Sequence, residues 1–206
     1  MARSAADGPR AGGEDKRRLI LRAAVKVFAE RGYHGCRIAD IAREAGVAYG
    51  LVYHYFENKE ALLTSIFEES WTLFTHVVKS VAESDAPIAT KLQQIVDVAL
   101  DAYRAHPHVV QVMVLEIARS PFFLERQRID AFQATFDVTT QIIARGQEAG
   151  EVRTDIDPTH AVYLVFGCIE MILTGFVLGT LDVEDDEAFA SAKGDAYRVL
   201  LAGLSA

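Results

Sequence analysis

The stretch "GVAYGLVYHYFENKEAL", residues 46–62, decides how the chain folds, because it places four Phe or Tyr rings within residues 49–56 and then becomes polar. A short helix over these residues puts Val52 and Phe56, four positions apart, on one face. The side chains predicted to project away from that face are Gly50, Leu51, Tyr53 and His54. Rings that a core helix would bury are therefore predicted to lie on the surface.

The elements before this helix complete a helix-turn-helix. Apolar residues recur every fourth position from Lys16 and predict a helix that ends at Gly32. A shorter helix is predicted over residues 38–45, and Gly46 ends it. Two helices joined by a short glycine turn form a helix-turn-helix, whose second helix enters the major groove of DNA. We therefore predict a disordered arm over residues 1–13, a helix-turn-helix DNA-binding domain over 14–60, and a second domain over 61–206.

The rest of the chain is predicted to be helical, so the fold class is all-α. The expected helices cover residues 58–80, 87–105, 107–119, 122–149 and 158–181, and a last one ends near residue 204. The apolar helix over 160–181 approaches the length of a membrane span, yet Glu170 lies near its middle. We interpret it as a helix buried within a protein assembly.

Charge and cysteine content restrict the function. Residues 1–60 carry 11 Lys and Arg against 8 Asp and Glu, whereas the whole chain of 206 residues has a net charge of −8. Only the N-terminal quarter therefore suits a polyanion. Cys36 and Cys168 form no recognisable disulfide or metal motif, which favours a reduced, cytoplasmic protein. No catalytic or metal-ligating constellation stands out, so we expect no enzyme activity, cofactor or metal.

One segment resembles a known family. "GYHGCRIADIAREAGVAYGLVYHYFENKEALL", residues 32–63, is similar to the DNA-binding domain of the tetracycline-repressor (TetR) family of bacterial transcriptional regulators. The matching features are Ile41-Ala42, Ala45-Gly46-Val47, the run from Gly50 to Phe56, and Lys59 with Leu62. The resemblance implies a homodimeric, ligand-responsive repressor that binds a palindromic operator in double-stranded DNA.

The resemblance also implies which residues contact DNA. Residues at the positions of Tyr49, Gly50, Leu51 and Tyr53 commonly meet bases or sugars, and those at Tyr53, His54, Tyr55 and Lys59 commonly meet phosphates. Many relatives place a hydroxyl residue at positions 36 and 48, where it caps a helix or contacts phosphate. This chain has Cys36, a weaker donor, and Ala48, which caps nothing.

Large side chains after residue 70 predict a ligand cavity, although each of them would also suit an ordinary core. The candidate ligand-binding residues are Trp71, Phe74, Tyr103, Met113, Glu116, Phe132, Phe136, Phe166, Glu170 and Phe176. Glu116 and Glu170 lie within apolar runs, where they would orient a ligand or pair with Arg119 or Arg104.

Small residues along the helix over 158–181 predict a dimer interface, because they let another helix approach closely. The candidate interface residues are Gly167, Met171, Gly175, Gly179, Val199, Leu200 and Leu204. The stretches "HPHVVQVMVLEIARS", residues 106–120, and "FGCIEMILTGFVLG", residues 166–179, further resemble the branch of the family that regulates fatty-acid degradation (FadR-like). This resemblance implies a long-chain acyl-CoA effector. The basic residues Arg119, Arg126 and Arg128 would then meet the nucleotide phosphates.

Two other readings are open from the sequence alone. A helical lipid carrier or enzyme would show no DNA binding at low salt. A constitutive DNA-binding protein would have a filled C-terminal core and no effector.

Overall fold

The structure is a computed structural model that describes residues 8–117 and 126–206. The chain forms two compact units, residues 1–67 and 68–206, and the division falls inside helix α4 (Lys59–Glu83). Within the described residues the regular elements are all helical, as predicted, apart from one isolated bridge between Val152 and Ser205. The boundary expected from the sequence lay at residue 60, seven residues before the division.

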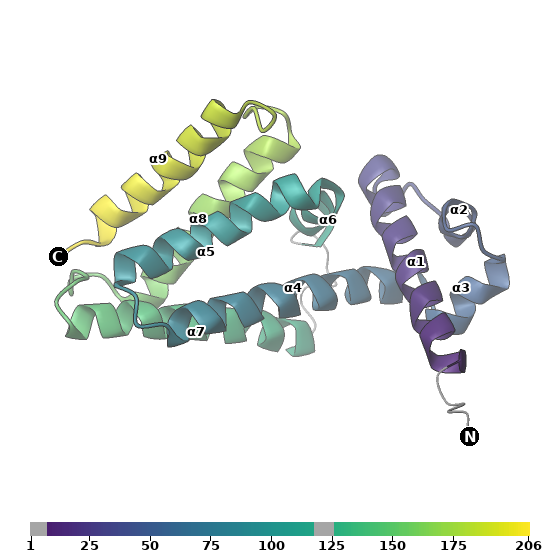
Figure 1. Cartoon of the computed structure of the whole chain (residues 1–206), viewed down its shortest axis with the longest axis horizontal. Helices are drawn as coiled ribbons and strands as arrows, with labels where there is room; N and C mark the ends of the chain where they lie inside the picture. The colour runs from purple at the N-terminus through teal and green to yellow at the C-terminus, as the bar shows by residue number, and fades with distance from the viewer. Residues whose placement is uncertain (1–7, 118–125) are drawn as a thin grey trace, which may run out of the picture. The chain divides into compact units, whose positions relative to one another are not determined.

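The first unit holds α1 (Gly8–Arg31), α2 (Ile38–Glu44), α3 (Tyr49–Tyr55) and the start of α4. α1 packs against α2, and α2 packs against α3 (Figure 1). Phe28, Ile41 and Val52 are fully buried between these helices, and each such side chain contributes about 1.5–3 kcal/mol of burial free energy. Residues 8–13, expected to be disordered, belong to α1.

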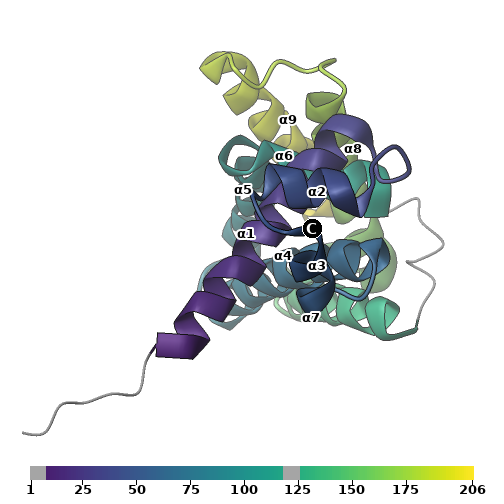
Figure 2. The ribbon, with the colours of Figure 1, turned by 90° about the vertical axis from the view of Figure 1, so that its right-hand side faces the viewer.

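The second unit is built around α5 (Ile88–Ala105), which contacts α6 (Pro107–Val112), α7 (Arg126–Glu148), α8 (Pro158–Val177) and α9 (Asp186–Leu204). In both views α7 and α9 lie on opposite sides of α5 (Figures 1 and 2). The buried residues of α5 recur at three- and four-residue spacing and include Leu92, Ile95 and Ala99. This periodicity explains its central position, since the helix has an apolar face to bury.

Two sequence signals define α8. Asp157 caps the helix, because its carboxylate accepts hydrogen bonds from the main-chain amides of Thr159 (2.8 Å) and His160 (3.3 Å). These amide donors also lower the pKa of the Asp157 carboxyl. α8 is the one helix of the described residues that is long and apolar enough to cross a membrane, a test that core helices of soluble proteins also pass. The helix ends at Val177, four residues before the predicted end.

The predicted helix over 107–119 is interrupted. α6 ends at Val112, and a π-helical turn, η1 (Met113–Ile117), follows it. Such turns are rare and are frequent at functional sites. Arg119 lies outside the described residues.

Candidate nucleic-acid interface and effector site

The turn between α2 and α3 fixes which side chains of α3 face outward. Gly46 has a positive φ of 64°, a conformation that glycine adopts without steric cost, and the amide of Val47 donates to the carbonyl of Ala42. Val52 points into the core and is fully buried. The four exposed residues of α3 are Tyr49, Gly50, Tyr53 and His54. Leu51 and Tyr55 are half-buried.

Tyr49 and Tyr53 form a pair on the exposed face of α3. Their side chains are 53% and 45% exposed, their hydroxyl oxygens lie 3.1 Å apart, and their rings meet edge to face at 5.2 Å. The hydrogen bond from Tyr49 raises the pKa of Tyr53. Tyr53 therefore keeps its proton at physiological pH, and a neutral phenol can donate to a phosphate or a base edge.

Cys36 does not belong to this surface. Its side chain is buried, and its thiol donates to the carbonyl of Tyr33 at 3.5 Å. A buried thiol cannot reach a phosphate group, so the prediction of Cys36 as a DNA contact is wrong. Ala48 precedes α3 without a capping side-chain bond.

Lys59, the first residue of α4, is half-buried. Its ammonium donates to the carbonyls of Tyr33 (2.5 Å) and Cys36 (3.1 Å) and lies 4.3 Å above the centre of the Tyr33 ring. Two of its three N–H donors are thus used within the chain. Its role as a phosphate contact stays a prediction.

Asp40 holds α1 and α2 together, a role that the sequence analysis missed. Its carboxylate accepts hydrogen bonds from the amide of Arg37 (2.9 Å) and from the guanidinium groups of Arg31 (2.9 Å) and Arg43 (2.5 Å). The Arg37 amide, followed by the two guanidinium groups, lowers the pKa of Asp40. A carboxylate three residues after the N-cap, here Arg37, is the available sequence signal, since that spacing is typical of a capping box.

In the second unit, six rings from α4, α7 and α8 form one aromatic cluster. Its members are Trp71, Phe74, Phe132, Phe136, Tyr163 and Phe166. Trp71 stacks on Phe132 with centroids 4.8 Å apart, and Phe136 stacks on Phe166 at 4.6 Å. Five of the six were predicted as ligand-binding residues, and Tyr163 was missed. An apolar ligand would find aromatic surface from three helices here.

A pair of hydroxyls fastens α4 to α7 beside this aromatic cluster. The oxygens of Thr75 and Thr135 lie 2.6 Å apart, and Thr135 is fully buried. Thr75 also donates to the carbonyl of Trp71. The stacked ring of Trp71 and the hydroxyl of Thr75, one turn later, therefore both bind α4 to α7.

The other predicted ligand residues lie elsewhere. Tyr103 and Phe176 pack with Phe189 in a second ring cluster, where the Tyr103 hydroxyl donates to the carbonyl of Phe176 at 3.2 Å. Burial, followed by the charge of Glu184, raises the pKa of Tyr103. Tyr103 and Phe176 are therefore placed in the core between α5, α8 and α9 and not in the aromatic cluster.

The two predicted carboxylates differ in position. Glu116 is half-buried in η1, as is Met113. Glu170 is exposed, because the buried face of α8 is set by Val162, Val165 and Ile169. The expectation that Glu170 lines a ligand cavity is therefore wrong. The side chains of Arg126 and Arg128, like Arg119, lie outside the described residues.

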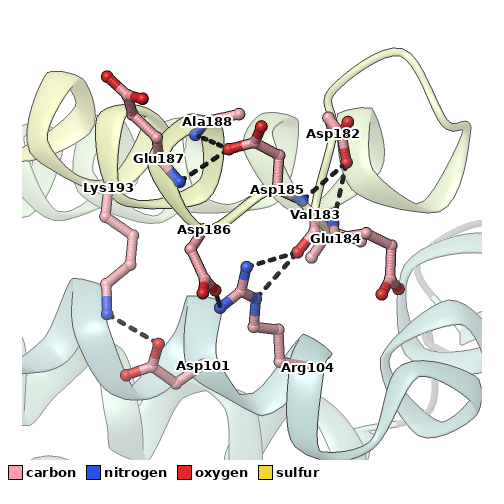
Figure 3. A network of polar contacts seen from close by, with 10 residues as sticks. All are labelled: Asp101, Arg104, Asp182, Val183, Glu184, Asp185, Asp186, Glu187, Ala188 and Lys193. Carbon is pink, nitrogen blue, oxygen red and sulfur yellow. Dashed lines mark hydrogen bonds and ion pairs between the residues drawn. The ribbon is translucent and has the colours of Figure 1, made fainter.

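Arg104, one suggested partner for those carboxylates, anchors α9 instead. Its guanidinium donates to the carbonyl of Val183 (2.7 and 2.9 Å) and to Asp186 (2.6 Å), as Figure 3 shows, and lies 4.0 Å above the Phe189 ring. Lys193 of α9 reaches down to Asp101 at 2.7 Å. A groove of about 320 Å³ runs between α5 and α9 beside these pairs. Since both cations that line the groove are engaged within the chain, we assign them an anchoring role.

Five large apolar side chains on or directly after α8 and on α9 remain exposed, and we call them the outer apolar face. This face consists of Tyr163, Leu164, Met171, Leu178 and Val199, with Met171 67% and Val199 68% exposed. Gly167 of α8 has open space around its α-carbon. The placement of Gly167, Met171 and Val199 is compatible with the predicted interface, which stays a prediction.

Three of the seven predicted interface residues do not face outward. A side chain at Gly175 would meet Leu181 of the same chain at 2.7 Å, and Leu200 and Leu204 are buried in the core of their own unit. These three positions are covered by their own chain, so their assignments to the interface are wrong. Gly179 is exposed just beyond the end of α8, where its positive φ of 67° favours glycine, and its place in the interface stays a prediction.

An exposed helix-turn-helix on one compact unit, joined to a second helical unit with an aromatic cluster, defines a DNA-binding regulator of the helix-turn-helix class. Residues 20–66 match the bacterial regulatory proteins of the tetR family, and residues 67–200 match the C-terminal region of YsiA-like proteins. The chain therefore belongs to the tetR family of bacterial regulatory proteins, as predicted.

Three similar proteins concern fatty acids. The chain is 30% identical to the fatty acid metabolism regulator protein of Bacillus subtilis over 77% of its own length and 82% of the relative. It shares 29% identity and a TM-score of 0.81 with the fatty acid degradation regulator FadR from Bacillus halodurans, over 97% and 98% of the chains. With FadR from Bacillus subtilis in complex with stearoyl-CoA it shares 27% identity and a TM-score of 0.79, over 90% and 98%.

Proposed function

We propose that the chain is a homodimeric repressor that leaves a palindromic operator when a long-chain acyl-CoA binds its second unit. It would act in the cytoplasm, where its DNA lies, and the proposal assigns it no catalytic step. The carrying observation is the aromatic cluster, in which apolar rings from α4, α7 and α8 meet. The likeness to FadR with stearoyl-CoA supports this choice of ligand.

The dimer part of the proposal rests on the outer apolar face. Tyr163, Leu164 and Met171 on α8 and Val199 on α9 are exposed, the two helices contact each other, and exposed apolar surface of this kind marks protein interfaces. A second copy related by a two-fold axis presents the same face, so each covers the other. The dimer also supplies the two recognition helices that a palindromic operator requires.

We expect α4 to couple ligand binding in the second unit to release of the operator by the first. This helix carries Trp71 and Thr75 in the second unit and begins with Lys59 in the first. An acyl chain inserted among the rings must compete with the Trp71–Phe132 stack. Ligand and operator therefore favour different placements of α4, and the ligand changes operator occupancy only by its differential affinity for the two states.

Trp71 makes the ligand test direct, because it is the only tryptophan of the chain. We expect CoA thioesters to change its fluorescence, with affinity rising roughly fourfold per added methylene until the site is full, since each buried methylene contributes about 0.8 kcal/mol. The free fatty acid of equal chain length should bind more weakly, because it lacks the nucleotide.

Variants locate the site in the same titration. Phe132→Leu, within the aromatic cluster, should weaken binding, whereas the control Phe189→Leu, in the second ring cluster, should leave it unchanged. If CoA thioesters of every length fail to bind, the acyl-CoA proposal is wrong, and the regulator takes another effector or none.

A further inference from the structure

One side chain, that of Lys59, connects the two ends of the segment that contains the helix-turn-helix. Tyr33 and Cys36 lie in the turn between α1 and α2, and Lys59 lies at the start of α4. The segment from Tyr33 to Lys59 therefore contains the whole of α2 and α3. Both ends of this segment meet where the Lys59 ammonium binds the two carbonyls and covers the Tyr33 ring.

The chemistry of this contact favours a mechanical role for Lys59. Carbonyls in a turn have no helical partner, and an ammonium is a strong donor to them. By contrast, a cation in the first turn of a helix is unfavourable for the helix dipole, so helix stability does not explain a lysine here. Asn58, whose side-chain oxygen accepts from the amide of Ala61 at 2.8 Å, already caps α4.

Closure of the segment affects DNA reading through α3. α3 packs against α2 and is followed along the chain by α4, and Lys59 links the start of α4 to the turn at residues 33–36 that precedes α2. Without the link, α4 and this turn are free to separate, and α3 samples more orientations. Binding to the operator must then restrict α3 to one orientation again, and this entropy cost lowers the specific affinity. Binding to DNA of arbitrary sequence depends on charge and needs no single orientation, so it should change less.

We propose that Lys59 is a positioning residue, which sets the orientation of the recognition helix by tying α4 to the turn between α1 and α2. The inference rests on the DNA-binding function and is independent of the effector. It predicts an effect on sequence discrimination, whereas a lysine that only neutralises a phosphate would affect all duplexes alike.

The test compares Lys59→Met with Lys79→Met, which removes the same charge from the exposed far part of α4. Binding is measured by fluorescence anisotropy, across salt concentrations, to a duplex selected from a randomised library with the wild-type protein. A shuffled duplex of equal composition is the second probe. Lys59→Met should lose about tenfold or more on the selected duplex and under about threefold on the shuffled one. The slope of affinity against salt should stay unchanged, and Lys79→Met should behave as wild type.

Two results would overturn the inference. One is an equal loss on both duplexes with a salt slope smaller by about one unit, which identifies a phosphate contact. The other is unchanged discrimination in a folded Lys59→Met. If the wild type itself fails to select a duplex, the DNA-binding function fails and not this inference alone.

A second variant covers the case in which Lys59→Met does not fold. Tyr33→Leu removes the ring under the ammonium, leaves both carbonyls and changes no charge. Thermal unfolding followed by circular dichroism establishes that the variant is folded. It should lower the ratio of selected to shuffled affinity, and an unchanged ratio contradicts the proposal.

Discussion

At the scale of single residues, the hydroxyl groups of Tyr49 and Tyr53 hold each other in place on the exposed face of α3. One hydroxyl donates to the other across 3.1 Å, so the pair retains one proton for a phosphate or a base. The pair is also held by ring contact at 5.2 Å, which lowers the number of conformations to be ordered on DNA. The two side chains should therefore act as a unit.

A double-mutant cycle on this pair tests the expectation. Tyr49→Phe and Tyr53→Phe should each cost roughly 0.5–1.5 kcal/mol of operator binding, because each removes one hydrogen-bonding group. The double variant should cost less than the sum of the two. Anisotropy on the selected duplex provides the measurement, with Tyr197→Phe of α9 as the control. Strictly additive losses would show that the hydroxyls make independent contacts.

Asp40 should make the stability of the first unit depend on pH in the acid range. The pKa of Asp40 is lowered in the folded state. The ionised carboxylate therefore stabilises the fold fully above the pKa of the unfolded chain, which is about 3.9 for Asp. This stabilisation is lost as the pH falls through the lower pKa of the folded state. Asp40→Asn should therefore lower the urea midpoint at neutral pH and have little effect at about pH 2. Circular dichroism at the two pH values checks this, and an equal effect at both would show that the carboxylate charge is irrelevant.

At the scale of elements, α9 is held by main-chain contacts as much as by charge. Asp186 is almost fully exposed, so its ion pair with Arg104 contributes little in water. Arg104 also donates two hydrogen bonds to the carbonyl of Val183, and its guanidinium lies over the ring of Phe189, which is buried. The loop before α9 is therefore fixed mainly by the guanidinium as a donor.

Substitution separates the two contributions. Arg104→Met should lower the free energy of unfolding of the second unit by about 1–3 kcal/mol, because the carbonyl loses a charged donor. Arg198→Met is the matched control, since that arginine pairs only with exposed Asp195 on its own helix, and it should cost under about 0.5 kcal/mol. Urea unfolding followed by Trp71 fluorescence measures both. Equal costs would contradict the role of the carbonyl.

Periodicity and motif were enough to predict the helices and the outward face of α3, because they depend on local spacing. Val52 lies inside and Tyr53 outside for reasons visible in the sequence. By contrast, Leu200 and Leu204 were assigned to an interface because sequence does not distinguish the face of α9 that packs on its own unit. The acceptors of Lys59 are main-chain carbonyls, which residue identity does not reveal.

At the scale of the whole molecule, the outer apolar face is where two chains are proposed to meet. Met171→Glu and Val199→Glu each place a charge at an exposed apolar position, so burial in a dimer would cost several kcal/mol per charge. Both should yield monomers in sedimentation at micromolar concentration, whereas Gln141→Glu, exposed on α7, should remain dimeric. A wild-type monomer under these conditions would contradict the proposed assembly.

The most direct test of the central proposal is the titration of the complex between the wild-type protein and its selected duplex with CoA thioesters of increasing chain length, followed by anisotropy. We predict that long chains release the duplex, that short chains and free CoA do not, and that the duplex weakens acyl-CoA binding by the same factor as acyl-CoA weakens duplex binding. A duplex isotherm that no CoA thioester shifts, although Trp71 reports that the ligand binds, would show that acyl-CoA does not control this regulator.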